Sequence, residues 1–308
     1  MKPLRIIFMG TPHFACRALD EIIKAGHEPI CIYTQPPRPS GRGQKLVESP
    51  VKKFALNHHL IVETPTSFRE ARVIQHFLAK AADVVIVAAY GLILPQEIVL
   101  NRNAPCINIH ASLLPRWRGA APIQRAIMEG DKTTGITLMR METGLDTGPI
   151  IAKEELMIGA DDAGALHDRL AALGASMIVD SLQQLAEGPL PENPQTTNGI
   201  TYAHRLSSAD EPLDWIKPAT QLSLQIRALS PKPGASFTRA GEKWKILAAD
   251  IDDSCTDGAP GEVLDNCLTI SCGQGKLHPR IVQRPGKKPL PTSEALRGTP
   301  IPIGTILS

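Results

Sequence analysis

Residues 106–123 of the chain read CINIHASLLPRWRGAAPI, and this stretch decides the fold. Its first part alternates apolar and polar residues, as a strand does when successive side chains point to opposite faces. Asn108 and His110 therefore leave one face of a strand together. A turn through residues 112–115 follows, and we expect a helix to start near Pro122. Open α/β sheets bind ligands beyond the carboxyl ends of their strands, so the amide and the imidazole mark a candidate site.

Apolar and amphipathic segments alternate on both sides of this stretch, which is typical of a doubly wound α/β sheet. We expect strands at residues 5–9, 29–33, 61–63, 83–89, 106–110, 135–141 and 150–157. We expect helices at residues 14–25, 50–58, 67–81, 122–128 and 163–186. Ser67 and Asp162 are the expected N-caps of two of these helices. After the first strand, Gly10-Thr11-Pro12 lacks the second and third glycines of a dinucleotide-binding fingerprint, which disfavours a nicotinamide cofactor.

The second part of the chain has a different composition. A chain of 308 residues exceeds the usual size of one domain, so we expect two. We assign residues 1–188 to the first domain, residues 189–206 to a linker rich in Pro, Asn, Thr and Gln, and residues 207–308 to the second. A short helix is expected at residues 219–228, followed by β-like runs at residues 243–248, 261–264, 268–272 and 280–283. Short runs separated by turn residues predict a small β-barrel.

Composition excludes several classes of protein. Apolar residues make up 43% of the chain and charged residues 21%, as in an ordinary globular protein, and aromatics at 4% disfavour a stacking platform for single-stranded nucleic acid. The longest apolar run, residues 84–94, is far shorter than the ~20 residues of a membrane span, so we expect a cytoplasmic protein without membrane contact. The six cysteines show no zinc-binding spacing, and we expect buried thiols and no metal site.

Positive charge is concentrated in two places although the net charge is only +2. Residues 35–45 are rich in Pro and Gly, so we expect an irregular loop. This loop and its flank carry five basic residues against one acidic residue: Arg38, Arg42, Lys45, Lys52 and Lys53 against Glu48. The C-terminal segment, residues 276–308, also has a basic excess. The loop is either an ordinary solvated surface loop or a cover for a phosphate backbone.

Asn108, His110 and Asp146 form a candidate catalytic set. An amide can stabilise a developing oxyanion, an imidazole can exchange a proton near neutral pH, and a carboxylate can orient the imidazole or hold a water. Because no Ser or Cys lies in a nucleophile elbow, the set suits direct attack of an amine on a carbonyl. The alternative is structural: two satisfied polar groups at a strand end, and an Asp that belongs to ordinary turn chemistry between two glycines.

Five motifs carry a resemblance to a known family. They are FMGTP at residues 8–12, QPPRP with GRG at residues 35–43, AYGLILP at residues 89–95, NIHASLLPRWRGAAPI at residues 108–123 and GLDTG at residues 144–148. Together they resemble the folate-dependent formyltransferases, in the two-domain form that acts on charged tRNA. The resemblance implies an N-terminal Rossmann-like doubly wound formyltransferase domain and a C-terminal OB-like β-barrel that binds tRNA.

The family also implies a reaction and a set of site residues. The reaction would be formyl transfer from 10-formyltetrahydrofolate to the α-amino group of methionyl initiator tRNA, for translation initiation. Asn108, His110 and Asp146 would be catalytic. The residues implied to contact folate are Ser112, Leu113, Leu114, Pro115, Tyr90 and Leu92, and those implied to contact tRNA are Arg42, Arg38 and Lys45. We expect a monomer. The rival classes are a formyltransferase for a small amine or sugar nucleotide, an RNA-binding protein with a dead site, and a dehydrogenase.

Overall fold

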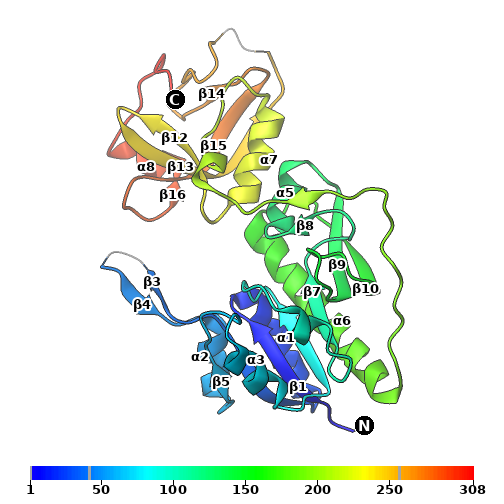
Figure 1. Ribbon diagram of the computed structural model, residues 1–308. Helices are drawn as coiled ribbons and strands as arrows, with labels where there is room; N and C mark the ends of the chain where they lie inside the picture. The colour runs from blue at the N-terminus through cyan, green and yellow to red at the C-terminus, as the bar shows by residue number, and fades with distance from the viewer. Residues whose placement is uncertain (1, 41–42, 256–257) are drawn as a thin grey trace. The chain divides into compact units, whose positions relative to one another are not determined.

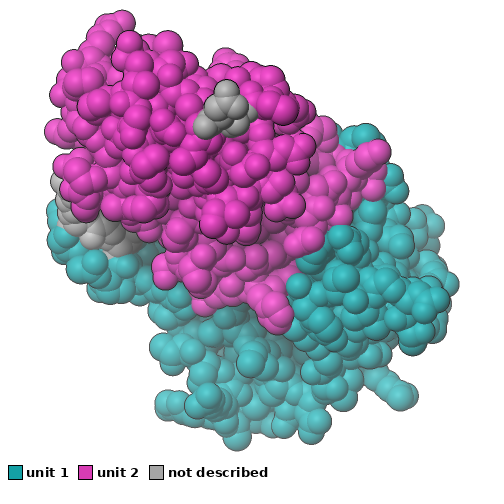
Figure 2. Space-filling view, turned by 90° about the horizontal axis from the view of Figure 1, so that it is seen from above, with its two compact units in different colours: residues 1–119, 134–157, 167–202 teal, residues 120–133, 158–166, 203–308 magenta. Residues whose placement is uncertain are grey.

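The computed structural model describes residues 2–40, 43–255 and 258–308, and Figure 1 traces its helices and strands. The chain divides into two compact units, which Figure 2 shows in different colours. Unit 1 comprises residues 1–119, 134–157 and 167–202, and unit 2 comprises residues 120–133, 158–166 and 203–308. Among the helices in the described part of the chain, none is both long and apolar enough to cross a membrane.

Unit 1 contains a seven-stranded sheet with strand order β10-β9-β7-β6-β1-β2-β5. Its strands are β1 (Arg5–Gly10), β2 (Glu28–Tyr33), β5 (Val62–Glu63), β6 (Val84–Ala88), β7 (Cys106–His110), β9 (Thr133–Arg140) and β10 (Ile150–Met157). The run from β7 through β6, β1 and β2 to β5 is parallel, and β9 is antiparallel to β7. All five residues of β6 are buried, as in a central strand covered on both faces. The predicted parallel α/β sheet is confirmed.

The helices between these strands follow the apolar periodicity of the sequence. They are α1 (His13–Lys24), α2 (Pro50–Asn57), α3 (Ala71–Leu78), α4 (Gln96–Val99) and α6 (Ala163–Glu187). Ser49 caps α2 by accepting from the Lys52 N–H at 3.0 Å. The predicted cap Asp162 is confirmed, since its carboxylate accepts from the Ala165 N–H at 2.9 Å. The predicted cap Ser67 is wrong: α3 starts four residues later, because Phe68 is buried in the core and holds the chain before the helix.

The Pro- and Gly-rich segment after β2 also differs from the prediction of an irregular loop. Residues Arg38–Ser40 (β3) and Lys45–Val47 (β4) pair as a short antiparallel hairpin, with Arg38 opposite Val47 and Ser40 opposite Lys45. Pro39 is tolerated because a two-stranded hairpin leaves one edge of each strand without a partner. Two further short strands, β8 (Arg118–Gly119) and β11 (Tyr202–Ala203), pair with each other.

Unit 2 is built around a curled antiparallel sheet with strand order β12-β13-β15-β14, and β16 also pairs with β15. Its elements are α5 (Pro122–Met128), the 3-10 helix η1 (Ser208–Asp210), α7 (Ala219–Leu229), β12 (Ala235–Arg239), β13 (Glu242–Asp252), β14 (Ile270–Ser271), β15 (Lys276–Gln283), β16 (Leu290–Pro291) and α8 (Thr292–Arg297). Trp215, Phe237 and Trp244 lie at the centre of its core. The predicted short helix at residues 219–228 corresponds to α7, and the curled antiparallel sheet agrees with the predicted OB-like β-barrel. The run at residues 261–264 forms isolated bridges only, and β12 and α8 were not predicted.

Candidate functional site

The candidate site lies at the carboxyl edge of the parallel strands of unit 1 (Figure 1). β6 and β7 run in the same direction with Val87 opposite Asn108, so both strands end at this edge. Asn108 and His110 alternate with buried isoleucines along β7, as the sequence pattern predicts. The segments that leave β6 and β7 therefore start side by side.

His110 uses one ring nitrogen to bind the backbone. Its Nε2 lies 2.9 Å from the carbonyl oxygen of Trp117, and because a carbonyl only accepts, Nε2 carries a hydrogen. The other nitrogen, Nδ1, lies 3.8 Å from Oδ2 of Asp146. Both side chains are shielded from solvent, with 6% of His110 and 13% of Asp146 exposed. The structure thus brings together the imidazole and the carboxylate that the sequence singled out.

Asp146 lies in a turn that imposes an uncommon backbone conformation. Its φ is +50°, in the left-handed region that Asp enters more readily than most non-glycine residues. Its Oδ2 atom accepts a hydrogen bond from the Gly119 N–H at 2.8 Å. Two residues later, a Cβ on Gly148 would overlap the carbonyl oxygen of Arg140, so only glycine fits there. The conformation of this turn and the Gly119 N–H therefore support the carboxylate.

Asn108 keeps its amide available. The side chain is half-buried on β7, on the same face as His110. Within the described residues, the Asn108 amide has no hydrogen-bond partner, so its two N–H donors are open to a ligand oxygen. The Asn108 amide thus shares a strand face with the imidazole that the Asp146 carboxylate approaches.

The loop that follows β7 contains a cis peptide bond between Leu114 and Pro115. Thr137 on β9 is fully buried and holds this loop, since its hydroxyl donates to the Ser112 carbonyl at 2.7 Å and accepts from the Leu114 N–H at 3.1 Å. The side chains of Ser112 and Leu114 are buried, whereas Leu113 and Pro115 are half-buried. Leu113 and Pro115 are therefore the two members of this group with side-chain surface to offer a ligand.

Tyr90 follows β6, but its ring is part of the core. It is 2% exposed and packs against Phe68 with a ring-centroid distance of 6.3 Å. Its carbonyl oxygen accepts from the Thr11 hydroxyl at 2.8 Å and from the Gln35 amide at 3.0 Å. Burial raises the pKa of the Tyr90 phenol well above its usual range. Leu92 is half-buried on the same apolar cluster, so the segment after β6 is an apolar wall anchored through its backbone.

The basic residues after β2 are on the β3–β4 hairpin. Arg38 lies at the start of β3 and Lys45 at the start of β4, and both are exposed. Arg42 lies outside the described residues. Leu46, also on β4, is 71% exposed, so the hairpin presents apolar as well as basic side chains to solvent. The two exposed cations could contact a polyanion.

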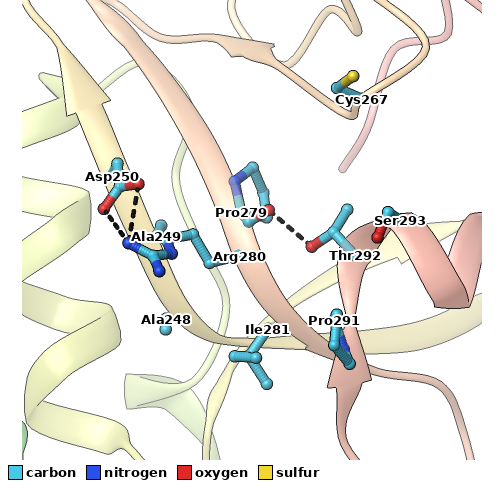
Figure 3. Close-up of a pocket in the computed structure, with 10 residues that line it drawn as sticks. All are labelled: Ala248, Ala249, Asp250, Cys267, Pro279, Arg280, Ile281, Pro291, Thr292 and Ser293. Atoms are coloured by element: carbon cyan, nitrogen blue, oxygen red, sulfur yellow. Dashed lines mark hydrogen bonds and ion pairs between the residues drawn. The ribbon is translucent and has the colours of Figure 1, made fainter.

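A pocket lies in unit 2, lined by residues of β13, β15, β16 and α8. It is an open pocket of about 620 Å³ (Figure 3), lined by Ala248, Ala249, Asp250, Cys267, Pro279, Arg280, Ile281, Pro291, Thr292 and Ser293. Arg280 lies 3.4 Å from the Asp250 carboxylate, and the Thr292 hydroxyl donates to the Pro279 carbonyl at 2.6 Å. Arg280, Asp250 and Thr292 are thus engaged in contacts within the pocket.

Two contributors to the site were not predicted. Thr137 is an ordinary strand residue in the sequence, and Gln195 lies in the segment interpreted as a linker, yet its side chain bonds to the turn that carries Asp146. Neither residue has a motif or a composition signal that could have identified it.

Among the described residues, no group of three or more His, Cys, Asp or Glu side chains lies close enough together to hold a metal ion.

Comparison with known protein families gives two matches along the chain. Residues 4–182 match the formyl transferase family, and residues 205–300 match the formyl transferase C-terminal domain. A methionyl-tRNA formyltransferase from Paramagnetospirillum magneticum is 50% identical to this chain over 306 residues, which is 99% of this chain and 100% of the relative. The similarity therefore spans both units.

Solved structures share the fold at much lower identity. HypX from Aquifex aeolicus, in complex with tetrahydrofolic acid, matches with a TM-score of 0.66 and 19% identity over 96% of this chain, which spans only about half (47%) of the HypX chain. The N-formyltransferase from Helicobacter canadensis, in complex with folinic acid and dTDP-3-aminofucose, has a TM-score of 0.67 and 17% identity over 90% of this chain and 99% of that one. At these identities the two structures show a common fold.

Proposed function

Because the chain belongs to the methionyl-tRNA formyltransferase family, we propose that it transfers the formyl group of 10-formyltetrahydrofolate to the α-amino group of methionyl initiator tRNA. The observation that supports this reaction is the distance of 3.8 Å between Oδ2 of Asp146 and Nδ1 of His110, at the carboxyl edge of the sheet. The choice of tRNA over a sugar nucleotide is supported by 50% identity to a tRNA-directed relative, against 17% to a sugar-directed one.

The reaction begins with a neutral amine. An α-amino group with a pKa near ~8 is partly neutral at physiological pH, so its lone pair can attack the formyl carbon. A carbon–nitrogen bond forms, and the formyl oxygen takes up negative charge in a tetrahedral intermediate. Asn108 donates an amide N–H to this oxyanion. Because Nε2 of His110 is bound to the Trp117 carbonyl, a protonated His110 would act through the hydrogen on Nδ1.

The second step expels the folate. Asp146 removes the surplus proton of the attacking amine through a water. The oxyanion then re-forms the carbonyl as the bond between the formyl carbon and N10 of tetrahydrofolate breaks, and N10 receives the proton that Asp146 took up, through the same water. The Gly119 N–H holds Oδ2 of Asp146 at 2.8 Å and leaves Oδ1 for this water. No covalent enzyme intermediate is needed, which agrees with a site formed by an amide, an imidazole and a carboxylate.

The substrates have separate contact sets in this proposal. The residues proposed to contact the folate are Ser112, Leu113, Leu114, Pro115, Tyr90 and Leu92. Of these, Leu113, Pro115 and Leu92 have exposed side-chain surface. Arg38, Arg42 and Lys45 are proposed to approach the tRNA acceptor end. Residues 1–188 then serve as the catalytic domain, residues 189–206 as a linker, and residues 207–308 as a tRNA-binding domain. We further propose a monomer that works in the cytoplasm.

The decisive experiment is formylation of methionyl initiator tRNA with 10-formyltetrahydrofolate by the full chain. Methionyl elongator tRNA is the matched control, and dTDP-3-aminofucose tests the rival acceptor class. The proposal predicts efficient formylation of the initiator, weak formylation of the elongator and none of the sugar nucleotide. Formylation of the sugar nucleotide instead would overturn the assignment of the acceptor. Binding of tRNA without any folate-dependent product would overturn the assignment of an active site.

A further inference from the structure

Gln195 binds the turn that carries Asp146. Its amide nitrogen donates to two backbone carbonyls of this turn, that of Asp146 at 2.8 Å and that of Gly148 at 2.8 Å. One side chain thereby spans the turn from the aspartate to its terminal glycine. Both amide hydrogens of Gln195 are used in these bonds.

Arg118 fixes the orientation of that amide. Its guanidinium donates to Oε1 of Gln195 from Nε at 3.2 Å and from Nη2 at 2.7 Å. A guanidinium has no acceptor, so it can face only the oxygen of the amide and directs the NH2 group toward the turn. Arg118 is 6% exposed, which removes competition from water and makes this pairing specific.

The backbone next to Arg118 also contacts the Asp146 side chain. Gly119, which follows Arg118, donates its N–H to Oδ2 of Asp146 at 2.8 Å. The backbone of residue 146 has a φ of +50°, a conformation that persists in a non-glycine residue only when its surroundings hold it. Gln195 holds the carbonyl of that residue, and Gly119 holds its carboxylate.

We propose that Gln195, oriented by Arg118, is a positioning residue that keeps the Asp146 carboxylate directed at Nδ1 of His110. This inference rests on the proposed function, because the orientation of Asp146 affects the rate only if Asp146 takes part in the reaction. A segment that looks like a linker in sequence then supplies a residue that the chemistry depends on. We expect the effect on kcat, since within the described residues the Gln195 side chain bonds to Asp146, Gly148 and Arg118 and not to the residues proposed to hold the folate.

Gln195 makes two sets of bonds: its amide oxygen accepts from Arg118, and its amide nitrogen donates to the carbonyls of Asp146 and Gly148. Gln195→Ala removes both sets. Gln195→Glu keeps an oxygen acceptor for Arg118 but places an oxygen against the two carbonyls. Each variant should lower kcat by about 10- to 100-fold, as a misplaced catalytic group does, with the KM for folate unchanged within about twofold. A near-normal Gln195→Glu would show that the Arg118 bond alone matters and would overturn the proposal.

Gln225→Ala is the matched control. Gln225 also donates its amide nitrogen to two backbone carbonyls, those of Asp210 and Pro212, both at 2.9 Å, but it lies in unit 2. Gln225→Ala therefore removes the same pair of amide-to-carbonyl hydrogen bonds as Gln195→Ala, without touching the Asp146 turn, and its kcat should be close to that of the parent. Thermal unfolding of all variants identifies any loss of kcat that is due to a general loss of stability.

A double-mutant cycle with Asp146→Ala distinguishes positioning from a structural role. If Gln195 acts through Asp146, then Gln195→Ala should have little further effect on kcat in the Asp146→Ala background. Full additivity of the two losses would overturn the inference while leaving the role of Asp146 intact. Near-normal turnover of Asp146→Ala alone would instead show that the proposed function of Asp146 is wrong, so the two failures are distinguishable.

Discussion

The carbonyl oxygen of Trp117 accepts a hydrogen bond from Nε2 of His110 at 2.9 Å. This contact fixes the tautomer, because the nitrogen that faces a carbonyl must carry the hydrogen. Trp117 has a φ of +64°, and its N–H is held by the Thr201 hydroxyl at 2.9 Å, so the accepting carbonyl is itself fixed in place. In the proposed mechanism, proton exchange and contact with the oxyanion therefore use Nδ1, the nitrogen that faces Asp146.

Truncation of any of the three proposed catalytic residues should slow the chemical step. Asn108→Ala, His110→Ala and Asp146→Ala should each lower turnover by at least ~10², since each removes a group that acts on charge in the transition state. Single-turnover formylation at saturating folate measures this step directly. His76→Ala is a suitable control, because its side chain is 60% exposed and pairs only with the surface residue Glu63 among the described residues. Near-normal turnover of Asn108→Ala or His110→Ala would contradict the mechanism.

The buried Thr137 hydroxyl gives a second prediction, on folate binding. Thr137→Val keeps the shape of the side chain but leaves the Ser112 carbonyl and the Leu114 N–H without their partner. We expect a loss of about 1–3 kcal/mol in the free energy of unfolding and a higher KM for folate, because the loop after β7 loses its support. Urea unfolding and steady-state kinetics measure the two effects.

Thr134→Val on the same strand is the control for this prediction. Thr134 is 2% exposed, and its hydroxyl is buried without a partner among the described residues, so its removal should be neutral or stabilising. Equal destabilisation by both substitutions would show that the hydrogen bonds of Thr137 do not hold the loop. An unchanged KM in Thr137→Val would remove the proposed link between this loop and the folate.

The sequence predicts the parallel strands well because buried strands leave a simple signal. β6 reads VVIVA, and all five of its residues are buried. β10 also coincides with the predicted residues 150–157, although Ile151 is its only buried residue. The alternation along β7 also predicts that Asn108 and His110 share a face. These features depend on residues that are neighbours in the chain, where periodicity is informative.

Long-range contacts of the site could not be predicted in the same way. The approach of Asp146 to His110 depends on β9 running antiparallel to β7, which no local pattern specifies. The contacts of Gln195 depend on a segment whose Pro, Asn, Thr and Gln content looks unstructured. Composition describes the average preference of a segment, whereas a single amide that binds a distant turn depends on tertiary structure.

Thiol reactivity gives a prediction that is independent of the reaction. Burial raises the pKa of the Cys106 thiol to about 12, whereas Cys255 and Cys267 are exposed, contrary to the prediction that all cysteines are buried. At pH 8 a thiol with that pKa has a thiolate fraction of roughly 10⁻⁴, so Cys106 should react only after unfolding. Mass-spectrometric footprinting with iodoacetamide should modify Cys255 and Cys267 first. Modification of Cys106 at the same rate would contradict its burial.

The β3–β4 hairpin gives the last prediction, on tRNA. Arg38→Ala and Lys45→Ala should each weaken methionyl-tRNA binding and reduce the slope of log affinity against log salt by about 1, because each removes one cation from a phosphate contact. The KM for folate should stay unchanged, since both residues lie on the hairpin and not on the loop after β7. Lys24→Ala is the control, because Lys24 already pairs with Asp20 at 2.7 Å. An unchanged salt slope with weaker folate binding would place the hairpin at the folate site instead.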